Sequence, residues 1–281
     1  MALTEFQLEI LQVIARNRNP NSHFAGGAVL NKNEPRISHD IDIFNDSAEI
    51  LTACLAADVA ALEANGYGVA FSYRSDAHVK ADVTKHKSST RIDWAQDSIW
   101  RFFPAAQDAI FGWRLNSFDL ATNKILAFAG RREPRDYVDT VALERRVPGS
   151  LATLVWAAPG KDPGWTPQLI LDEIVRNSRM SREDLAQVTT PESLDPVALK
   201  KQLLKAVAAA RDLFATLPLA TVGKVFLSKK GVPCTLTREV ATNPKLLPRD
   251  ASAYGALPVP QLESPTLAVG DKKDTGHGPV D

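Results

Sequence analysis

The stretch Gly26-Gly27-Ala28-Val29-Leu30, followed closely by His39-Asp40-Ile41-Asp42-Ile43-Phe44, decides the fold of this chain. In its second half apolar β-branched residues alternate with His or Asp, a pattern that predicts a β-strand. Because successive side chains of a strand point to opposite faces, Asp40 and Asp42 share one face and Ile41 and Ile43 the other. The carboxylates therefore interrupt a strand that otherwise looks buried.

The two carboxylates and the glycine pair together suggest a site for a metal-bound triphosphate. Asp40 and Asp42 lie about 7 Å apart along the strand and can chelate a hard divalent cation. Gly26 and Gly27 let the backbone approach a ligand without a Cβ in the way. Each motif alone has a simpler interpretation, a solvated strand edge or a turn. However, burying two unpaired carboxylates costs free energy, so we expect a cation there.

Length and composition predict a globular protein without a bulk electrostatic field. The 281 residues are 44% hydrophobic and 23% charged, and 33 basic residues balance 33 acidic ones. That balance excludes a strong overall attraction to nucleic acid or membrane, so such binding needs local patches. Cys54 and Cys234 lie far apart, which fits a reducing compartment. With no signal peptide and no apolar run long enough for a span, we expect a cytoplasmic protein without membrane contact.

A third acid occurs in Thr90-Arg91-Ile92-Asp93-Trp94-Ala95, which also alternates as a strand. Ile92 and Trp94 pack, so Asp93 points to the other face. Phosphoryl chemistry with two metal ions needs several carboxylate oxygens, one of them free to orient or deprotonate the attacking hydroxyl. The alternative is that Asp93 pairs with Arg91 or Arg101.

Two further candidates follow in predicted helices. Lys124 lies on an apolar helix closed by Gly130, and its ammonium points either to a cleft or to bulk water. Pro134 suits the first turn of the next helix, and Asp136 and Asp139 are neighbours on one face of it. Asp136 can also be an ordinary first-turn acid stabilised by the helix dipole.

The domain prediction is a core at 1–147, a helical domain at 148–240 and an extended, Pro/Gly-rich tail at 241–281. Pro and Gly cluster at 147–167, where the core is expected to end. Basic residues outnumber acidic ones strongly at 200–249, which would grip an RNA backbone if they gather on one side. His78 and His86 have no neighbours at metal-ligand spacing, so we predict no catalytic role for them.

The glycine pair with Arg36-Ile37-Ser38-His39-Asp40-Ile41-Asp42, the helix of Asp119 and Lys124, and Arg135-Asp136-x-x-Asp139 occur in an order that resembles the AbiEii-type nucleotidyltransferases. These are toxins of type IV toxin–antitoxin pairs, within the DNA polymerase β-like superfamily. The resemblance covers about residues 20–145. It departs at Ala28, where relatives usually have Ser or Thr, so Ser38 or the backbone would supply the missing contact to phosphate.

The resemblance implies an α/β (α+β) fold with a nucleotidyltransferase-like mixed sheet flanked by helices. Beyond it, the sequence pattern predicts a helical domain followed by an extended C-terminal tail. It implies transfer of a nucleoside monophosphate from an NTP to a hydroxyl acceptor, the tRNA 3′ end, with an antitoxin protein as partner. The implied metal ligands, for two Mg²⁺ or Mn²⁺ ions, are Asp40, Asp42 and Asp93. Lys124 and Asp136 complete the implied catalytic set, and the implied nucleotide-binding residues are Gly26, Gly27, Arg36, Ser38 and Lys124.

Two other functions remain open from the sequence. The same core could modify a small-molecule hydroxyl, as antibiotic-modifying nucleotidyltransferases do. It could also be a non-catalytic relative that binds a nucleotide or a protein partner; Ala28 favours this interpretation, and the intact acids at 40, 42 and 93 speak against it.

Overall fold

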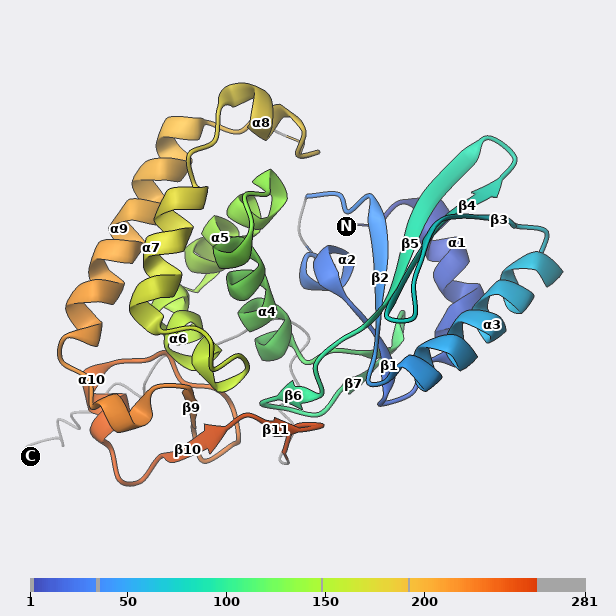
Figure 1. Ribbon diagram of the computed structural model, residues 1–281. Coiled ribbons are helices and arrows are strands. Elements are labelled where there is room, and N and C mark those ends of the chain that lie inside the picture. Colours follow the sequence, from blue (N-terminus) through green and yellow to red (C-terminus); the bar gives the residue numbers. More distant parts are fainter. Residues whose placement is uncertain (1–2, 34–35, 148, 192, 257–281) are drawn as a thin grey trace, which may run out of the picture.

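The computed structural model of the chain describes residues 3–33, 36–147, 149–191 and 193–256, which form two lobes (Figure 1). The sheet lobe has a seven-stranded mixed sheet with helices α1, α2 and α3. The helical lobe contains helices α4 to α9. One continuous hydrophobic core extends through both lobes. The predicted mixed sheet flanked by helices and followed by a helical region is thus confirmed.

The sheet places its parallel pairs at its centre. In spatial order the strands are β3 (Gly68–Arg74), β4 (His78–Lys85), β5 (Ser88–Gln96), β2 (Asp40–Asn45), β1 (Ser22–Ala25), β8 (Gly112–Arg114) and β7 (Ala106–Asp108). Strands β2 and β5 run parallel, as do β1 and β8, and the other neighbours run antiparallel. Helices α1 (Glu5–Ile14) and α3 (Ala48–Ala64) cover one face, whereas α2 (Gly26–Leu30) and the helical lobe lie towards the other (Figure 1).

The helical lobe comprises α4 (Ser117–Gly130), α5 (Pro134–Arg146), α6 (Ser150–Ala157), α7 (Pro167–Asn177), α8 (Arg182–Ala186) and α9 (Pro196–Phe214). Side-chain caps start several of these helices. The Ser181 hydroxyl and the Asp184 carboxylate form a capping box at α8, and Asp195 caps α9. No helix among the described residues is both long and apolar enough to cross a membrane.

The predicted boundary at residue 147 falls inside the helical lobe. Helices α4 and α5 lie before it but pack against α6, α7 and α9. Gly149, with φ +84°, turns the chain from α5 into α6, so the sequence break there is a tight turn between packed helices. Proline and glycine mark both turns and linkers, which is why the sequence alone could not separate the two.

The first part of the predicted tail belongs to the folded structure. Helix α10 (Arg238–Thr242) is followed by β10 (Leu247–Asp250), which pairs with β9 (Lys224–Leu227). Strand β11 (Ser252–Ala253) then pairs with β6 (Trp100–Arg101) of the sheet lobe. Residues 247–256 therefore link the two lobes. The rest of the predicted tail, 257–281, lies outside the described residues.

A buried ion pair fixes which face of β5 is the core face. Trp94 donates its Nε1–H to Asp58 Oδ2 on α3 at 2.8 Å, and Arg18 contacts both oxygens of Asp58 at 2.6 and 2.7 Å. The Arg18 and Asp58 side chains are both 0% exposed. Because Trp94 faces α3, its neighbour Asp93 must face the opposite side of the sheet.

We predict that Asp58→Ala destabilises the fold by about 3–5 kcal/mol, because it leaves a buried guanidinium and the Trp94 N–H without their partner. Urea unfolding measures the change. Asp82→Ala is the control, since Asp82 pairs with Arg91 at 3.8 Å with both side chains half exposed; its cost should stay below about 0.5 kcal/mol. Equal costs for the two variants would contradict the assignment.

His23 on β1 is held neutral inside the fold. Burial and the Arg101 guanidinium lower its pKa from 6.5 to about 3. Arg101 Nη1 donates to His23 Nε2 at 3.3 Å, so Nε2 is the unprotonated ring nitrogen. The unfolded chain therefore takes up a proton near pH 6.5 that the folded chain binds only near pH 3.

This difference predicts a stability contribution that is complete above pH 6.5 and is lost as the pH falls towards 3. Relative to a His23→Gln variant, the wild-type free energy of unfolding should drop by about 1.4 kcal/mol for each pH unit below about 6. Urea unfolding of both proteins at pH 7, 6 and 5 measures it. Parallel pH profiles would show that His23 titrates normally in the fold.

Candidate active site

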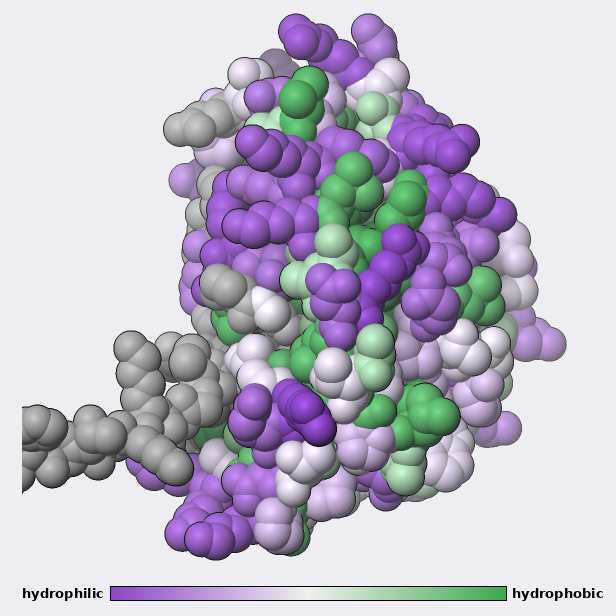
Figure 2. Space-filling view, turned by 90° about the vertical axis from the view of Figure 1, so that its left-hand side faces the viewer, coloured by the Kyte–Doolittle hydropathy of each residue, from purple (hydrophilic) through white to green (hydrophobic). Residues whose placement is uncertain are grey.

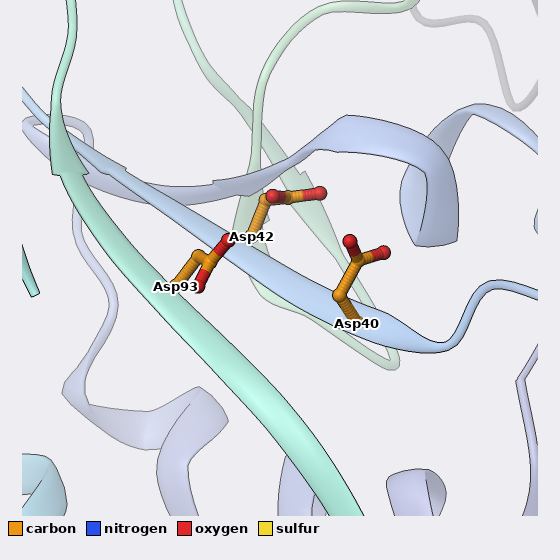
Figure 3. A group of neighbouring side chains, drawn as sticks. All are labelled: Asp40, Asp42 and Asp93. Carbon is orange, nitrogen blue, oxygen red and sulfur yellow. The ribbon is translucent and has the colours of Figure 1, made fainter. Parts of the chain in front are cut away.

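The three predicted metal ligands come together at one wall of a cavity between the two lobes. The cavity has a volume of about 310 Å³, and strands β2, β4 and β5, helix α2 and helices α4 and α5 contribute to its wall. Asp40 and Asp42 project from β2 to the same side, and Asp93 projects towards them from the adjacent strand β5 (Figure 3). One carboxylate oxygen from each of the three lies within 4.8 Å of the others.

The sheet register explains this meeting. Strands β2 and β5 pair in parallel with Asp42 directly opposite Asp93. Residues opposite each other on neighbouring strands point to the same face. The side chains of Ile41, Ile43 and Trp94 fill the opposite, core face and are at most 1% exposed. The parallel β2–β5 pairing therefore brings Asp93 directly beside the D-x-D strand.

Asp42 lies against the glycine pair. Gly26 adopts φ +67°, and a Cβ added to it would lie 1.7 Å from Asp42 Oδ2. The carboxylate thus occupies the space that glycine leaves free. Burial and repulsion by the carboxylates of Asp40 and Asp93 raise the pKa of Asp42 to about 7.

The other two carboxylates have basic neighbours. Arg135 Nη1 donates to Asp40 Oδ2 at 2.5 Å, and the Ser38 hydroxyl donates to Asp40 Oδ1 at 3.0 Å. Burial opposes ionisation of Asp40, but the Arg135 guanidinium outweighs it and lowers the Asp40 pKa. Lys80 Nζ lies 3.8 Å from Asp93 Oδ2. Burial raises the Asp93 pKa despite this lysine.

The arrangement fits a divalent cation on chemical grounds. Asp93 Oδ1 is buried and has no hydrogen-bond partner among the described residues. The described residues also provide no hydrogen bond to the Asp42 carboxylate, although the repulsion around it is strong. Three hard oxygen ligands gathered in this way, with unused lone pairs, are suited to Mg²⁺ or Mn²⁺.

The opposite wall carries a second network, centred on Lys124. Lys124 Nζ contacts Asp136 Oδ1 at 2.7 Å and Asp139 Oδ2 at 3.1 Å. Arg36 donates two hydrogen bonds to Asp139, at 2.6 and 3.0 Å. Burial disfavours the ammonium form of Lys124, but Asp139 and Asp136 outweigh it and raise the Lys124 pKa. Lys124 and Arg36 line the cavity as charged groups held in place from behind.

Asp136 itself lies behind the cavity wall. It is 0% exposed and receives Lys124 on one oxygen and Arg131 Nε on the other, at 2.8 Å. Its carboxylate can position these two cations, but it is not part of the cavity lining. The contribution of Asp136 is therefore better described as positioning than as contact with a substrate.

Ala28 stands where the nucleotidyltransferases that this sequence resembles usually have Ser or Thr, and Ser38 lies close to the same glycine pair in the fold. Helix α2 begins at Gly26, and Ala28 is 1% exposed. The Ser38 hydroxyl lies over Gly27, 3.0 Å from where a Cβ of that glycine would be, and Ser38 lines the cavity. A hydroxyl thus lies beside the glycine pair from another segment of the chain.

Sequence reasoning missed four basic groups of the cavity lining: His78, Lys80, Arg131 and Arg135. His78 has no neighbour at metal-ligand spacing in the sequence, but in the fold it shares a face of β4 with Lys80, which pairs in register with Asp93. The alternating pattern of residues 78–82 indicates that His78 and Lys80 share a strand face, but only the pairing of β4 with β5 brings that face to Asp93. For Arg135, the sequence shows only that it precedes Asp136.

The comparisons with known proteins place the fold. No family model matches this sequence, and no curated protein matches it. Among solved structures, the chain is similar to MenT4, a nucleotidyltransferase toxin from Mycobacterium tuberculosis H37Rv. The TM-score is 0.53 at 16% sequence identity, and the match covers 74% of this chain and 82% of that chain. The predicted nucleotidyltransferase fold is therefore confirmed.

We predict that Gly26→Ala weakens Mn²⁺ or Mg²⁺ binding by about 10-fold or more, because the new Cβ displaces the Asp42 carboxylate from the ligand set. Calorimetric titration measures the affinity. Gly66→Ala is the matched control, because Gly66 has φ +77° and no atom within 4 Å of an added Cβ.

Both substitutions should cost about 1 kcal/mol of stability through the left-handed backbone. The loss of metal affinity should accompany Gly26→Ala alone. An unchanged affinity in a folded Gly26→Ala protein would show that the contact between Gly26 and Asp42 does not shape the site.

Proposed function

We propose that this chain is a metal-dependent nucleotidyltransferase that moves a nucleoside monophosphate from an NTP to the 3′-terminal hydroxyl of an RNA, tRNA being the expected acceptor. The observation that carries the proposal is the meeting of Asp40, Asp42 and Asp93 at a cavity of a nucleotidyltransferase fold, opposite a wall of basic side chains.

The cavity has the charge distribution that a triphosphate requires. Five Lys and Arg side chains line it against three carboxylates; they are Arg36, Lys80, Lys124, Arg131 and Arg135. Mg²⁺ ions bound by the three aspartates would supply the remaining charge neutralisation and would lower the pKa of the acceptor hydroxyl. The Arg36 guanidinium and the Ser38 hydroxyl lie against Gly27, where both can donate hydrogen bonds to phosphate oxygens.

The roles of the individual side chains follow from their positions. Lys124, fixed by Asp136 and Asp139, presents its ammonium to phosphate oxygens as negative charge moves onto the leaving group. Asp93 has a free oxygen in the cavity wall, and in its ionised form this carboxylate orients or deprotonates the acceptor hydroxyl. That hydroxyl attacks the α-phosphorus in line, the bond from the α-phosphorus to the bridging oxygen breaks, and pyrophosphate leaves.

Two features support an RNA acceptor and a toxin role. Arg131 lines the cavity with its side chain 52% exposed, where it can contact a polyanion. One solved structure of similar fold, MenT4, is that of a nucleotidyltransferase toxin. A toxin of this kind would need a partner antitoxin, and its NTP and tRNA substrates place the proposed activity in the cytoplasm.

The basic segment at 200–249 gives weaker support for RNA than its composition suggests. Arg211 pairs with Asp172 and Lys224 with Asp250, so part of the positive charge is neutralised within the fold. Figure 2 shows the outer side of the helical lobe, where hydrophilic side chains dominate and a narrow hydrophobic strip runs between them. The basic wall of the cavity is therefore the stronger argument for RNA.

We predict that Asp42→Asn reduces label transfer from an α-labelled NTP to total RNA, in the presence of Mg²⁺, by about 100-fold or more. The substitution keeps the size of the side chain and removes the central carboxylate charge. Asp82→Asn is the control and should transfer label at the wild-type rate, because Asp82 lies on the same sheet but outside the cavity lining. Transfer that survives in Asp42→Asn would remove the D-x-D strand from the mechanism.

The same assay separates the alternatives. Label in a small-molecule fraction, with none in RNA, would replace the RNA acceptor by a small hydroxyl compound. Binding of NTP without transfer to any acceptor would indicate the non-catalytic relative.

A further inference from the structure

Arg135 forms an ion pair with Asp40, a carboxylate that the proposed chemistry needs as a metal ligand. It extends from the first turn of α5 across the cavity, and its Nη1 lies 2.5 Å from Asp40 Oδ2 on β2. Asp40 belongs to the carboxylate group that fits a metal. The guanidinium therefore provides the positive charge that neutralises Asp40 in the structure described here.

A divalent cation and Arg135 compete for the same carboxylate. Both oxygens of Asp40 are engaged, one by Arg135 and the other by Ser38. A cation coordinated by Asp40 would lie within a few ångströms of the guanidinium, and two positive charges at that separation repel each other. Arg135 must therefore release Asp40, or at least move away from it, when the ligand set is filled.

Arg135 differs from the other cavity cations in its freedom to move. The Arg36 and Lys124 side chains are 8% and 10% exposed, and buried acids that are not candidate metal ligands hold them. The Arg135 side chain is 41% exposed, and Asp40 is its one ion-pair partner within the described part of the chain. Once it leaves Asp40, it keeps no acidic partner, but it remains at the cavity wall.

The planar fork of an arginine matches the oxygens of a phosphate group as well as those of a carboxylate. We infer that Arg135 exchanges partners during the catalytic cycle: it holds Asp40 before the metal binds and then moves its guanidinium to the triphosphate of the incoming metal–nucleotide complex. This inference rests on the proposed function. It adds a residue that opposes binding of the metal alone and favours binding of the metal together with an NTP.

The test uses two titrations of each full-length protein, whose folding is first verified by circular dichroism and thermal melting. The first titration uses Mn²⁺ alone. The second uses an α,β-methylene NTP analogue with saturating Mg²⁺, which binds without transfer. For Arg135→Gln we expect Mn²⁺ affinity to rise about 5-fold, because the competitor is gone. Analogue affinity should fall by about 10-fold or more, because the contact to phosphate is lost.

Two variants make the opposite shifts specific to Arg135. Arg131→Gln removes the same charge from the same cavity wall, but Arg131 pairs with Asp136 and not with a metal ligand. Its affinity for Mn²⁺ should change by less than about 2-fold. Arg135→Lys keeps the charge and loses the fork, so its analogue affinity should lie between those of wild type and Arg135→Gln.

Mn²⁺ affinity that is unchanged or reduced in Arg135→Gln would overturn the exchange, as would unchanged affinity for the analogue, while wild type binds both ligands normally. A wild-type protein that binds neither Mn²⁺ nor the analogue would instead overturn the proposed function, and this inference with it.

Discussion

Electrostatic repulsion among three carboxylates is the constraint on which the cavity depends. Oxygens of Asp40, Asp42 and Asp93 lie within 4.8 Å of one another, and two negative charges at that separation repel by about 3–4 kcal/mol at an effective dielectric constant of 20. If these strands had only a structural role, apolar residues at the three positions would avoid this repulsion. Burial and the charges of Asp40 and Asp93 raise the pKa of Asp42 to about 7, so that protonation of Asp42 relieves part of the repulsion. A bound divalent cation would relieve the repulsion more completely, because it carries two positive charges.

The compensating charges form two layers with different mobility. In the inner layer, Lys124 and Arg36 are fixed by ion pairs with Asp136 and Asp139. These two carboxylates neutralise the cations and are not candidate metal ligands. In the outer layer, Arg135 pairs with a metal-ligand candidate and Lys80 lies 3.8 Å from another. The fixed layer can position a nucleotide. The exposed layer can change partners, which a site must do if it is to be charge-balanced both empty and filled.

What the sequence predicted well is what local geometry determines. The period of two in 40–44 places both aspartates on one face. What it could not determine depends on register and on packing between distant segments. The pairing of Asp42 with Asp93, the proximity of Lys80 and His78, and the location of Asp136 behind Lys124 all require the sheet order and the crossing of helices. The sequence could not relate the break at 147 to the two lobes for the same reason, because only tertiary contacts assign α4 and α5 to the helical lobe.

At Ala28 the sequence lacks a hydroxyl that the fold supplies from another segment. By sequence, the residue after the glycine pair lacks a hydroxyl, which favours a degenerate site. In the fold, Ala28 packs into the core at 1% exposure, while Ser38 brings a hydroxyl over Gly27 and donates it to Asp40 at 3.0 Å. A phosphate group approaching Gly27 would meet that hydroxyl and the Arg36 guanidinium, which lies 2.6 Å from where a Cβ of Gly27 would be. The donors around the glycines are therefore present, though they come from the segment that leads into the D-x-D strand. Loss of the motif serine is thus a weak argument against catalysis, because a hydroxyl and a guanidinium still surround the glycine pair.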